Sequence, residues 1–284
     1  MLLHAPAKLN LCLYLGPRRA DGLHELCSLF EPLALADLIR VANSASGADE
    51  VHCPGVEGEN LAGRALAALR DRGWSRPPLR LEIEKRVPVA AGLGGGSADA
   101  AAVLRLARDP GGMAGWLPDF EEIAMQLGAD VPSQLRPALA LVRGAGERVE
   151  LLPDPAPHAT VLLPGGGGLS TAEVFAEADR LGLGRSDEEL DRLAGELRRV
   201  AGAGASPLAY PELLVNDLEP AALALRPAIG EALAALRAAG ATVALLSGSG
   251  PTAVGLFPDL AAAQAAAAAI DRDDAIVCEA GRAP

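Results

Sequence analysis

Residues 87–99 read Val-Pro-Val-Ala-Ala-Gly-Leu-Gly-Gly-Gly-Ser-Ala-Asp, and this glycine-rich stretch decides how the chain is interpreted. The alternating segment 79–84 precedes it and predicts a strand. An Ala/Leu/Arg-rich segment from about Ala98 to Arg108 follows and predicts a helix, with Ser97 as its N-cap. A strand, a glycine loop and a helix N-terminus together favour a phosphate, because free N–H groups and the helix dipole attract an anion. The alternative is a merely tight connection.

The loop fits neither of two common nucleotide-binding patterns. It is not a Walker A loop, because no Gly-Lys-Ser/Thr follows the glycines. It is not a dinucleotide fingerprint either, because the sixth position is Ser97 and no acidic ribose partner stands about 20 residues on. A phosphate site of another kind is therefore expected.

The segment Ala7–Leu15 alternates and predicts a half-buried strand. Its second face is expected to carry four residues: Lys8, Asn10, Cys12 and Tyr14. Among 25 basic residues only Lys8 and Lys85 are lysines, so a lysine in this strand favours a compact ammonium over a generic positive charge. This face is therefore expected to line something polar.

Three further segments are candidates for chemistry. Asp130, in Gly-Ala-Asp-Val-Pro, either caps the next turn or pairs with Lys8. A Lys–Asp pair beside a phosphate loop suits phosphoryl transfer to an alcohol, because the aspartate can accept the hydroxyl proton. His24 lies in a turn, where histidine is usually a surface residue, and the glycine turn 247–252 is either a tight connection or part of a site. The glycine run 165–168 has no assigned role.

Composition excludes several classes of function. The net charge of −12 repels nucleic acid and anionic membranes, so neither is expected as a partner. Pro6, Lys8 and Asn10 interrupt the apolar N-terminus before a signal peptide can form. The four cysteines are scattered without CxxC spacing, which indicates buried free thiols and a cytoplasmic protein.

The pattern of predicted strands and helices indicates an α+β chain in two domains, 1–153 and 154–284, with the Pro-rich step 154–157 as the boundary. Strands are expected at 28–35 and 37–42, and two capping boxes, at Ser170 and Ser186, are expected to open helices. A helix is expected at 219–239 with an interruption at Pro227.

Together these segments resemble the GHMP kinases, a family of small-molecule kinases without a Walker A loop. The resemblance runs along most of the chain and rests on motifs in the family's order. These are Pro6–Leu11, Arg19–Glu25, Pro88–Asp99, Gly128–Pro132, Ser170–Phe175, Asn216–Pro220 and Ser247–Thr252. The Asp-Gly-x-His-Glu and Asn-Asp-Leu-Glu-Pro segments point to the branch that acts on cytidine diphosphate methylerythritol.

The resemblance implies an N-terminal domain like the second domain of ribosomal protein S5 and a ferredoxin-like C-terminal domain. It implies transfer of the ATP γ-phosphoryl, with Mg²⁺, to the substrate's 2-hydroxyl in the non-mevalonate route to isoprenoids. No metal ligand is assigned, and the sequence does not give the oligomeric state.

By the same resemblance, Asp130 is the general base and Lys8 its charge partner. Asn10, His24, Thr171 and Phe175 hold the substrate, with His24 at the cytosine edge and Phe175 stacked on the base. The ATP phosphates are wrapped by eleven loop residues: Pro88, Val89, Ala90, Ala91, Gly92, Leu93, Gly94, Gly95, Gly96, Ser97 and Ala98. The glycine turn near the site contributes Gly248, Ser249 and Gly250.

Two departures from the family pattern stand out. Leu23 occupies a position that is usually aromatic, so cytosine would have one aromatic and one aliphatic face unless Tyr14 or Phe30 substitutes. Ala98 replaces the usual second serine, which leaves Ser97 as the loop hydroxyl. Three alternatives remain: another GHMP kinase such as a homoserine or mevalonate kinase, a dinucleotide-binding oxidoreductase, and a non-catalytic nucleotide-binding module.

Overall fold

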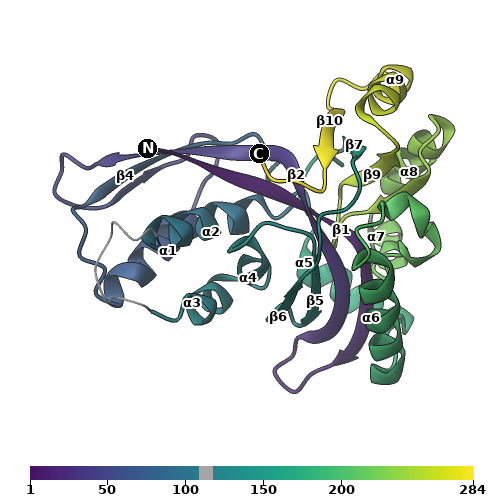
Figure 1. Ribbon diagram of the computed structural model, residues 1–284, viewed down its shortest axis with the longest axis horizontal. Coiled ribbons are helices and arrows are strands. Elements are labelled where there is room, and N and C mark those ends of the chain that lie inside the picture. The colour runs from purple at the N-terminus through teal and green to yellow at the C-terminus, as the bar shows by residue number, and fades with distance from the viewer. Residues whose placement is uncertain (109–117) are drawn as a thin grey trace.

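The computed structural model describes residues 1–108 and 118–284, which form two groups of strands and helices (Figure 1). The N-terminal strands are β1 (Leu2–Arg18), β2 (His24–Asn43), β3 (Glu50–His52), β4 (Leu79–Glu84), β5 (Ala140–Gly144) and β6 (Arg148–Leu151). The N-terminal helices are α1 (Leu61–Asp71), α2 (Gly95–Arg108), α3 (Phe120–Leu127) and α4 (Val131–Gln134).

Two long strands, β1 and β2, frame this part of the molecule. They pair antiparallel, with register shifts that mark three irregularities. The prediction of separate strands at 28–35 and 37–42 is wrong, because β2 runs unbroken from His24 to Asn43 and Ala36 still pairs with Pro6 of β1. The first half of β2 also pairs with β5 and the second half with β4. One strand thus carries two sections of sheet.

Helices α1 and α2 lie side by side along the β4 end of the sheet (Figure 1). Their buried faces carry small and branched side chains, among them Ala65 and Leu69 of α1 and Ala101 and Leu104 of α2. Alanines let the helices approach closely, so a chain with only 3% aromatic residues still builds a dense core.

The C-terminal strands are β7 (His158–Leu163), β8 (Val243–Leu246), β9 (Ala253–Phe257) and β10 (Ile276–Ala280). The C-terminal α-helices are α5 (Thr171–Leu181), α6 (Asp187–Ala201), α7 (Glu219–Leu225), α8 (Ala228–Ala238) and α9 (Leu260–Ile270). The strands lie in the order β10-β7-β9-β8. With helices between β7 and β8 and between β9 and β10, this order is the ferredoxin-like arrangement that was expected.

The two groups share strands rather than merely touching. Leu33 of β2 pairs with Ala280 of β10, so the described strands form one ten-stranded sheet. On β1, the Leu13 N–H donates to the Val215 carbonyl at 2.8 Å and the Asp217 N–H donates to the Leu13 carbonyl at 2.8 Å. The N-terminal strand is therefore held by the C-terminal half.

Helices α5 and α6 begin at the capping residues that the sequence predicts. Ser186 and Glu189 form the predicted reciprocal box at α6. At α5 the Ser170 hydroxyl accepts the Glu173 N–H, which is the serine half of such a box. Pro227 divides the predicted helix 219–239 into α7 and α8, as its missing N–H requires.

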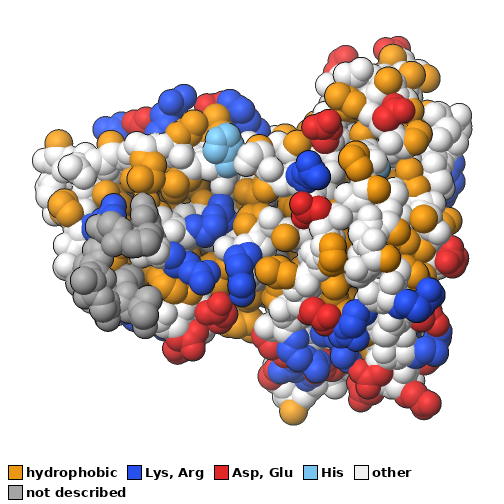
Figure 2. Space-filling model, viewed as in Figure 1, with side chains coloured by type: hydrophobic (Ala, Val, Ile, Leu, Met, Phe, Trp, Pro, Cys, Tyr) orange, Lys and Arg blue, Asp and Glu red, His pale blue; other side chains and the backbone are white. Residues whose placement is uncertain are grey.

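Acidic and basic side chains are interspersed over α6 and the β5–β6 hairpin, at the lower right of Figure 2. Arg198 pairs with Glu150 there at 2.6 Å, and Arg143 pairs with Asp191. The four cysteines, Cys12, Cys27, Cys53 and Cys278, are free thiols. Within 1–108 and 118–284, none of the helices has both the length and the apolar character needed to cross a membrane.

Candidate active site

An irregularity in β1 selects the side chains that face the site. The register against β2 shifts between Asn10 and Cys12, and a shift of one residue turns the following side chains to the opposite face. Lys8, Asn10 and Leu13 therefore line one cavity, whereas Cys12 and Tyr14 are buried in the core. The predicted polar face is right for Lys8 and Asn10 and wrong for Cys12 and Tyr14.

The Lys8 ammonium is fixed from three sides. Its Nζ donates to Asn10 Oδ1 at 2.6 Å, lies 3.3 Å from Asp130 Oδ2 and sits 4.7 Å from the centre of the Phe30 ring. Asn10 is oriented in turn, because its Nδ2 donates to the Ser28 hydroxyl at 2.9 Å. A buried network thus holds one positive charge at a defined point.

Asp130 lies between α3 and α4, at the N-cap position of α4. Its side chain makes no capping hydrogen bond, so the interpretation of this carboxylate as a cap is wrong. The carboxylate points instead toward Lys8 and keeps 32% of its side-chain surface exposed, in the same cavity.

The glycine loop comes close to this pair. The Lys8 N–H donates to the Leu93 carbonyl at 2.9 Å. Gly94 has φ +68°, and a Cβ there would lie 2.9 Å from Lys8 Cγ. Gly92 has φ +79°, and its Cβ would lie 2.5 Å from the Ser247 carbonyl oxygen. Neither position accepts a side chain without displacing its neighbours.

Helix α2 begins at Gly95, earlier than the predicted Ala98. The Gly94 carbonyl already accepts the Ala98 N–H at 2.9 Å. Ser97 is therefore a residue of the first helical turn, and its prediction as the N-cap is wrong. The glycines themselves supply the turn into the helix, so no side-chain cap is needed.

The second glycine turn lies against the loop. The Ser247 hydroxyl donates to the Gly92 carbonyl at 3.0 Å. Asn216 Nδ2 donates to the Leu246 and Gly248 carbonyls, both at 2.7 Å. The Asn216–Pro220 motif thus fixes the shape of a turn whose Gly248 and Ser249 line the cavity with Lys8.

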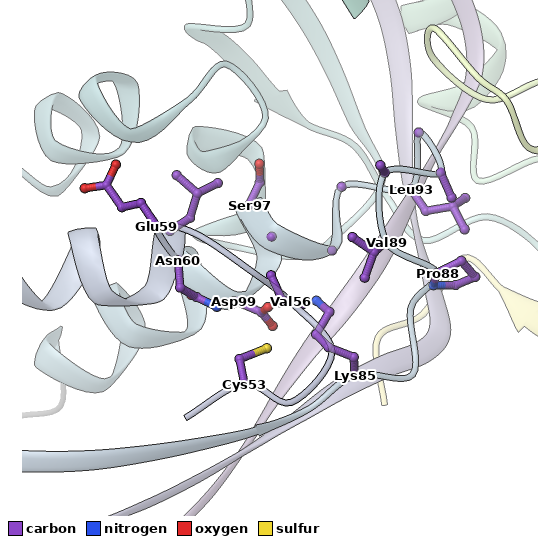
Figure 3. A pocket seen from close by; sticks show the side chains of 17 residues that line it. Cys53, Val56, Glu59, Asn60, Lys85, Pro88, Val89, Leu93, Ser97 and Asp99 are labelled. Carbon is purple, nitrogen blue, oxygen red and sulfur yellow. Dashed lines mark hydrogen bonds and ion pairs between the residues drawn. The ribbon is translucent and has the colours of Figure 1, made fainter. Parts of the chain in front are cut away.

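A first cavity of about 320 Å³ lies between the glycine loop and the start of α1 (Figure 3). Lys85 Nζ on its wall donates to Asp99 Oδ2 at 2.8 Å and to the Asp37 carboxylate. Two buried carboxylates share this ammonium, and burial raises the pKa of Asp99 to about 7. In the described residues, Asp99 Oδ1 has no hydrogen-bond partner.

A second cavity of about 710 Å³ contains Lys8, Asp130 and the predicted substrate residues. His24 Nε2 lies 2.7 Å from Asp179 Oδ1, and the His24 ring centre lies 5.3 Å from that of Phe175. The Thr171 and Ser249 hydroxyls are 2.9 Å apart. Residues from β1, β2, α5 and both glycine segments therefore meet around one space.

Leu23 lies at the mouth of the second cavity. Its side chain lines this cavity and is 52% exposed. Tyr14 cannot take its place, because the Tyr14 ring is buried and its hydroxyl donates to the Leu213 carbonyl at 2.7 Å. Phe30 does line the cavity, but it lies against Lys8.

The two cavities meet at the glycine loop, because Gly92, Gly94 and Ser97 line both. Lys8 and Asp130 lie on the wall of the larger cavity, beside this junction. Such an arrangement can hold two molecules with a phosphate of one near a group of the other, next to a carboxylate and an ammonium.

Comparisons with known proteins agree with this geometry. Residues 60–136 match a family model described as GHMP kinases N terminal domain, and residues 195–275 match one described as GHMP kinases C terminal. The chain belongs to the GHMP kinase family. It is thus a kinase with the family's two-domain α+β fold.

Curated relatives resemble this GHMP kinase over nearly its whole length. The 4-diphosphocytidyl-2-C-methyl-D-erythritol kinase of Anaeromyxobacter dehalogenans strain 2CP-C is 39% identical, with 94% of this chain and 83% of the relative aligned. The enzyme of the same name from Mesorhizobium japonicum is 40% identical, with 94% and 90% aligned. A crystal structure of 4-(cytidine 5'-diphospho)-2C-methyl-D-erythritol kinase has a TM-score of 0.81 at 34% identity, covering 99% of this chain and 100% of that one.

Three residues of this GHMP kinase's cavities were missed in the sequence. Lys85 could have been found, since it is the second of two lysines and stands just before the loop. Asp179 could also have been found, because it lies four residues after Phe175 and therefore on the same helix face. Asp99 gave no separate signal, because it falls in the first turn of the helix predicted from Ala98, where the helix dipole ordinarily explains an acidic residue.

Proposed function

We propose that this GHMP kinase transfers the γ-phosphoryl group of ATP to the 2-hydroxyl of 4-diphosphocytidyl-2-C-methyl-D-erythritol, on the non-mevalonate route to isoprenoid precursors. The observation that carries the proposal is the junction of two cavities at Gly92, Gly94 and Ser97, beside Lys8 and Asp130. The similarity to relatives with that name supports the choice of acceptor.

ATP lies on the side of the smaller cavity, with its phosphates along residues 88–98. Backbone N–H groups at the start of α2 face the phosphates, and the helix dipole adds to the attraction. This arrangement lets an acidic protein bind a polyanion through backbone groups. The base and ribose extend toward Asn60, Lys85 and Asp99.

Mg²⁺ accompanies the nucleotide in this proposal. In the described part of the chain no cluster of three His, Cys, Asp or Glu residues could hold a metal. The Ser97 hydroxyl lines both cavities and would hold the ion beside phosphate oxygens and water. When bound, the ion offsets the charge of the phosphates.

The acceptor lies in the larger cavity. Phe175 stacks on one face of cytosine and Leu23 covers the other. The carboxylate of Asp179 favours a proton on His24 Nε2, which leaves Nδ1 free to accept a hydrogen bond from the base when the ring is neutral. Thr171 and Asn10 contact the remainder of the substrate.

Asp130 accepts the proton of the 2-hydroxyl as its oxygen attacks the γ-phosphorus. The new O–P bond forms while the bond from the γ-phosphorus to the bridging oxygen breaks, and ADP leaves with that electron pair. Lys8 offsets the negative charge that gathers between the two cavities. Asn10 holds the ammonium in this position.

A coupled ADP-release assay tests the proposal. The purified chain should release ADP with 4-diphosphocytidyl-2-C-methyl-D-erythritol and should give no more than background with mevalonate or homoserine. Preference for either of the last two would assign another member of the family. No release with any of them would reject the kinase reaction proposed here.

Two further expectations belong to the same proposal. The domain limits stay at 1–153 and 154–284, and the enzyme works in the cytoplasm. Limited proteolysis of the full chain, with cleavage expected at 154–157, would test the domain limits. Fluorescence localisation of the full chain would test the compartment.

A further inference from the structure

The four glycines 165–168, between β7 and α5, bind the side chain of Arg226, which directly follows α7. Arg226 Nη1 donates to the Gly165, Gly166 and Gly167 carbonyls at 3.3, 3.1 and 2.7 Å, and Nη2 donates to the Gly168 carbonyl at 2.9 Å. A guanidinium has five donors in a fixed plane, so it can bind several carbonyls at once. This segment, called here the glycine strap (Gly165–Gly168), is thus held by a side chain from another part of the chain.

The helix break at Pro227 places Arg226 for this task. Arg226 has φ −142° and ψ 86°, the extended backbone expected before a proline. Helix α7 ends at Leu225, and the Arg226 side chain leaves the helix axis toward the strap. The half-buried guanidinium makes no salt bridge in the described residues, so backbone carbonyls are its recorded partners.

The strap connects directly to both sides of the active site. After it come Leu169 and the α5 N-cap Ser170, followed by Thr171, which lines the acceptor cavity. A Cβ at Gly168 would lie 3.3 Å from the Ala90 Cβ in the phosphate loop. A Cβ at Gly165 would lie 2.6 Å from the Pro251 side chain, next to the second glycine turn. The strap is therefore packed between the two glycine segments of the site.

Helices α5 and α7 share one core, which includes Val174 and Ala178 of α5 and Ala221 and Ala222 of α7. The Arg226 contact adds a link where α7 ends and the approach to α5 begins. Four consecutive glycines have no side chains of their own to order them, and glycine loses more conformational freedom on ordering than any other residue. An external partner is needed to hold such a segment in one shape.

We propose that Arg226 is a positioning residue for the acceptor substrate. By holding the glycine strap it fixes the start of α5, and so it sets where Thr171 and Phe175 meet the substrate. This inference rests on the proposed function, because it assigns the larger cavity to the acceptor. Arg226 touches neither substrate itself.

Steady-state kinetics of the full chain test this role. Arg226→Ala should raise the acceptor KM about tenfold, because charge-assisted hydrogen bonds that order the cavity wall are lost. Its kcat and its KM for ATP should stay within about twofold of wild type. Arg226→Lys keeps the charge without the planar fork and should raise the acceptor KM about threefold. Arg237→Ala is the matched control, because Arg237 binds a single carbonyl, that of Ala244, from helix α8.

Amide hydrogen exchange gives a second readout that does not depend on turnover. The first protected amides after the strap are those of Glu173 and Val174, which donate to the Ser170 hydroxyl and carbonyl at 3.4 and 3.0 Å. Their exchange should accelerate at least tenfold in Arg226→Ala, with α8 unchanged. In Arg237→Ala these two amides should exchange as in wild type. These measurements also apply to Arg226→Lys if the alanine variant does not fold.

An unchanged acceptor KM in Arg226→Ala, or unchanged exchange at Glu173 and Val174, overturns the inference. A fall in kcat with the acceptor KM unaltered overturns it too, since that pattern belongs to a catalytic group. Failure of the proposed function has a different signature, because the wild-type chain itself would then not phosphorylate the cytidine substrate. Exchange at Glu173 and Val174 would still decide whether Arg226 orders the start of α5.

Discussion

The ammonium of Lys8 and a carboxylate oxygen of Asp130 lie 3.3 Å apart, and the two side chains differ in exposure. Lys8 is 7% exposed and surrounded by Asn10 and Phe30, whereas Asp130 is 32% exposed and faces the larger cavity. The aspartate can therefore meet a substrate hydroxyl, while the lysine stays fixed behind it. This asymmetry gives the two residues separable roles.

Asp130→Asn should keep the fold and ATP binding but lower kcat by about 10²- to 10⁴-fold, because the amide cannot accept the hydroxyl proton. Rapid-quench measurement of phosphoryl transfer checks the rate, and thermal unfolding checks the fold. A variant that keeps more than about a tenth of wild-type kcat would remove Asp130 from the role of general base.

Lys8→Arg should be nearly inactive although the charge is retained. The guanidinium is larger and planar, while the Lys8 position is enclosed by Asn10, Phe30 and the backbone at Gly94. We expect a fall in kcat of at least about 10²-fold with the global fold intact. Near-normal turnover would show that any positive charge suffices here.

Gly94→Ala should lower kcat more than tenfold and raise the KM for ATP. The added Cβ would lie 2.9 Å from Lys8 Cγ, and φ is +68° at this residue. Gly96→Ala is the control from the same loop, since its Cβ would meet only Leu61 Cδ1, at 3.5 Å. Equal kinetics of the two variants would contradict the close approach of the loop to Lys8.

Leu23→Tyr should lower the KM for the cytidine substrate, by up to about tenfold if the second aromatic face adds ~1.4 kcal/mol of stacking. Phe175→Ala should raise the same KM, and the KM for ATP should stay constant in both. Leu2→Tyr, at another exposed leucine, should change nothing. If Leu23→Tyr also leaves the acceptor KM unchanged, then Leu23 does not cover the base.

His158 predicts a dependence of stability on pH. Burial alone lowers the pKa of His158, but the hydrogen bond and charge of Glu31, 3.2 Å away, outweigh it and raise that pKa. The protonated form is therefore favoured in the folded state. The His158–Glu31 pair therefore adds to the free energy of unfolding. This contribution is complete below about pH 6.5, the ordinary pKa of histidine, and is lost as the pH rises through the higher pKa of the folded state.

Urea unfolding at pH 6 and pH 9 checks this dependence. The free energy of unfolding should fall between these values in wild type, and His158→Gln should remove part of that fall. His52→Gln, at an exposed histidine, should retain the wild-type difference. An identical pH response in all three proteins would show that the His158–Glu31 pair contributes no such linkage.

Local patterns predicted most helices and strands of this chain, because alternation, capping residues and prolines act over a few positions. These local patterns gave wrong predictions where one strand pairs with several other strands. Two separate strands, 28–35 and 37–42, were predicted where pairing with β1, β4 and β5 keeps β2 continuous. Local patterns also could not predict that the side chains after Asn10 turn to the opposite face, because this bulge depends on the register of β1 against β2.

The site shows the same division. The glycine loop and Asp130 were found from their own sequence segments, and the structure brings both to Lys8. Contacts such as Asn10 with Ser28, or Arg226 with the glycine strap, join residues with no shared local pattern. Because arginine is common in this sequence, the sequence alone does not show which arginine binds backbone carbonyls.

Strand β1 has a consequence for how the protein is made. It leaves the ribosome early, but its backbone partners at Val215 and Asp217 and the β10 strand that closes on Leu33 emerge much later. Contacts between such distant segments form slowly, because long loops must close first. The antiparallel pair of β1 and β2 can form early, because the two strands are adjacent in the chain. The contacts that join this pair to the C-terminal half can close only after nearly the whole chain has been made.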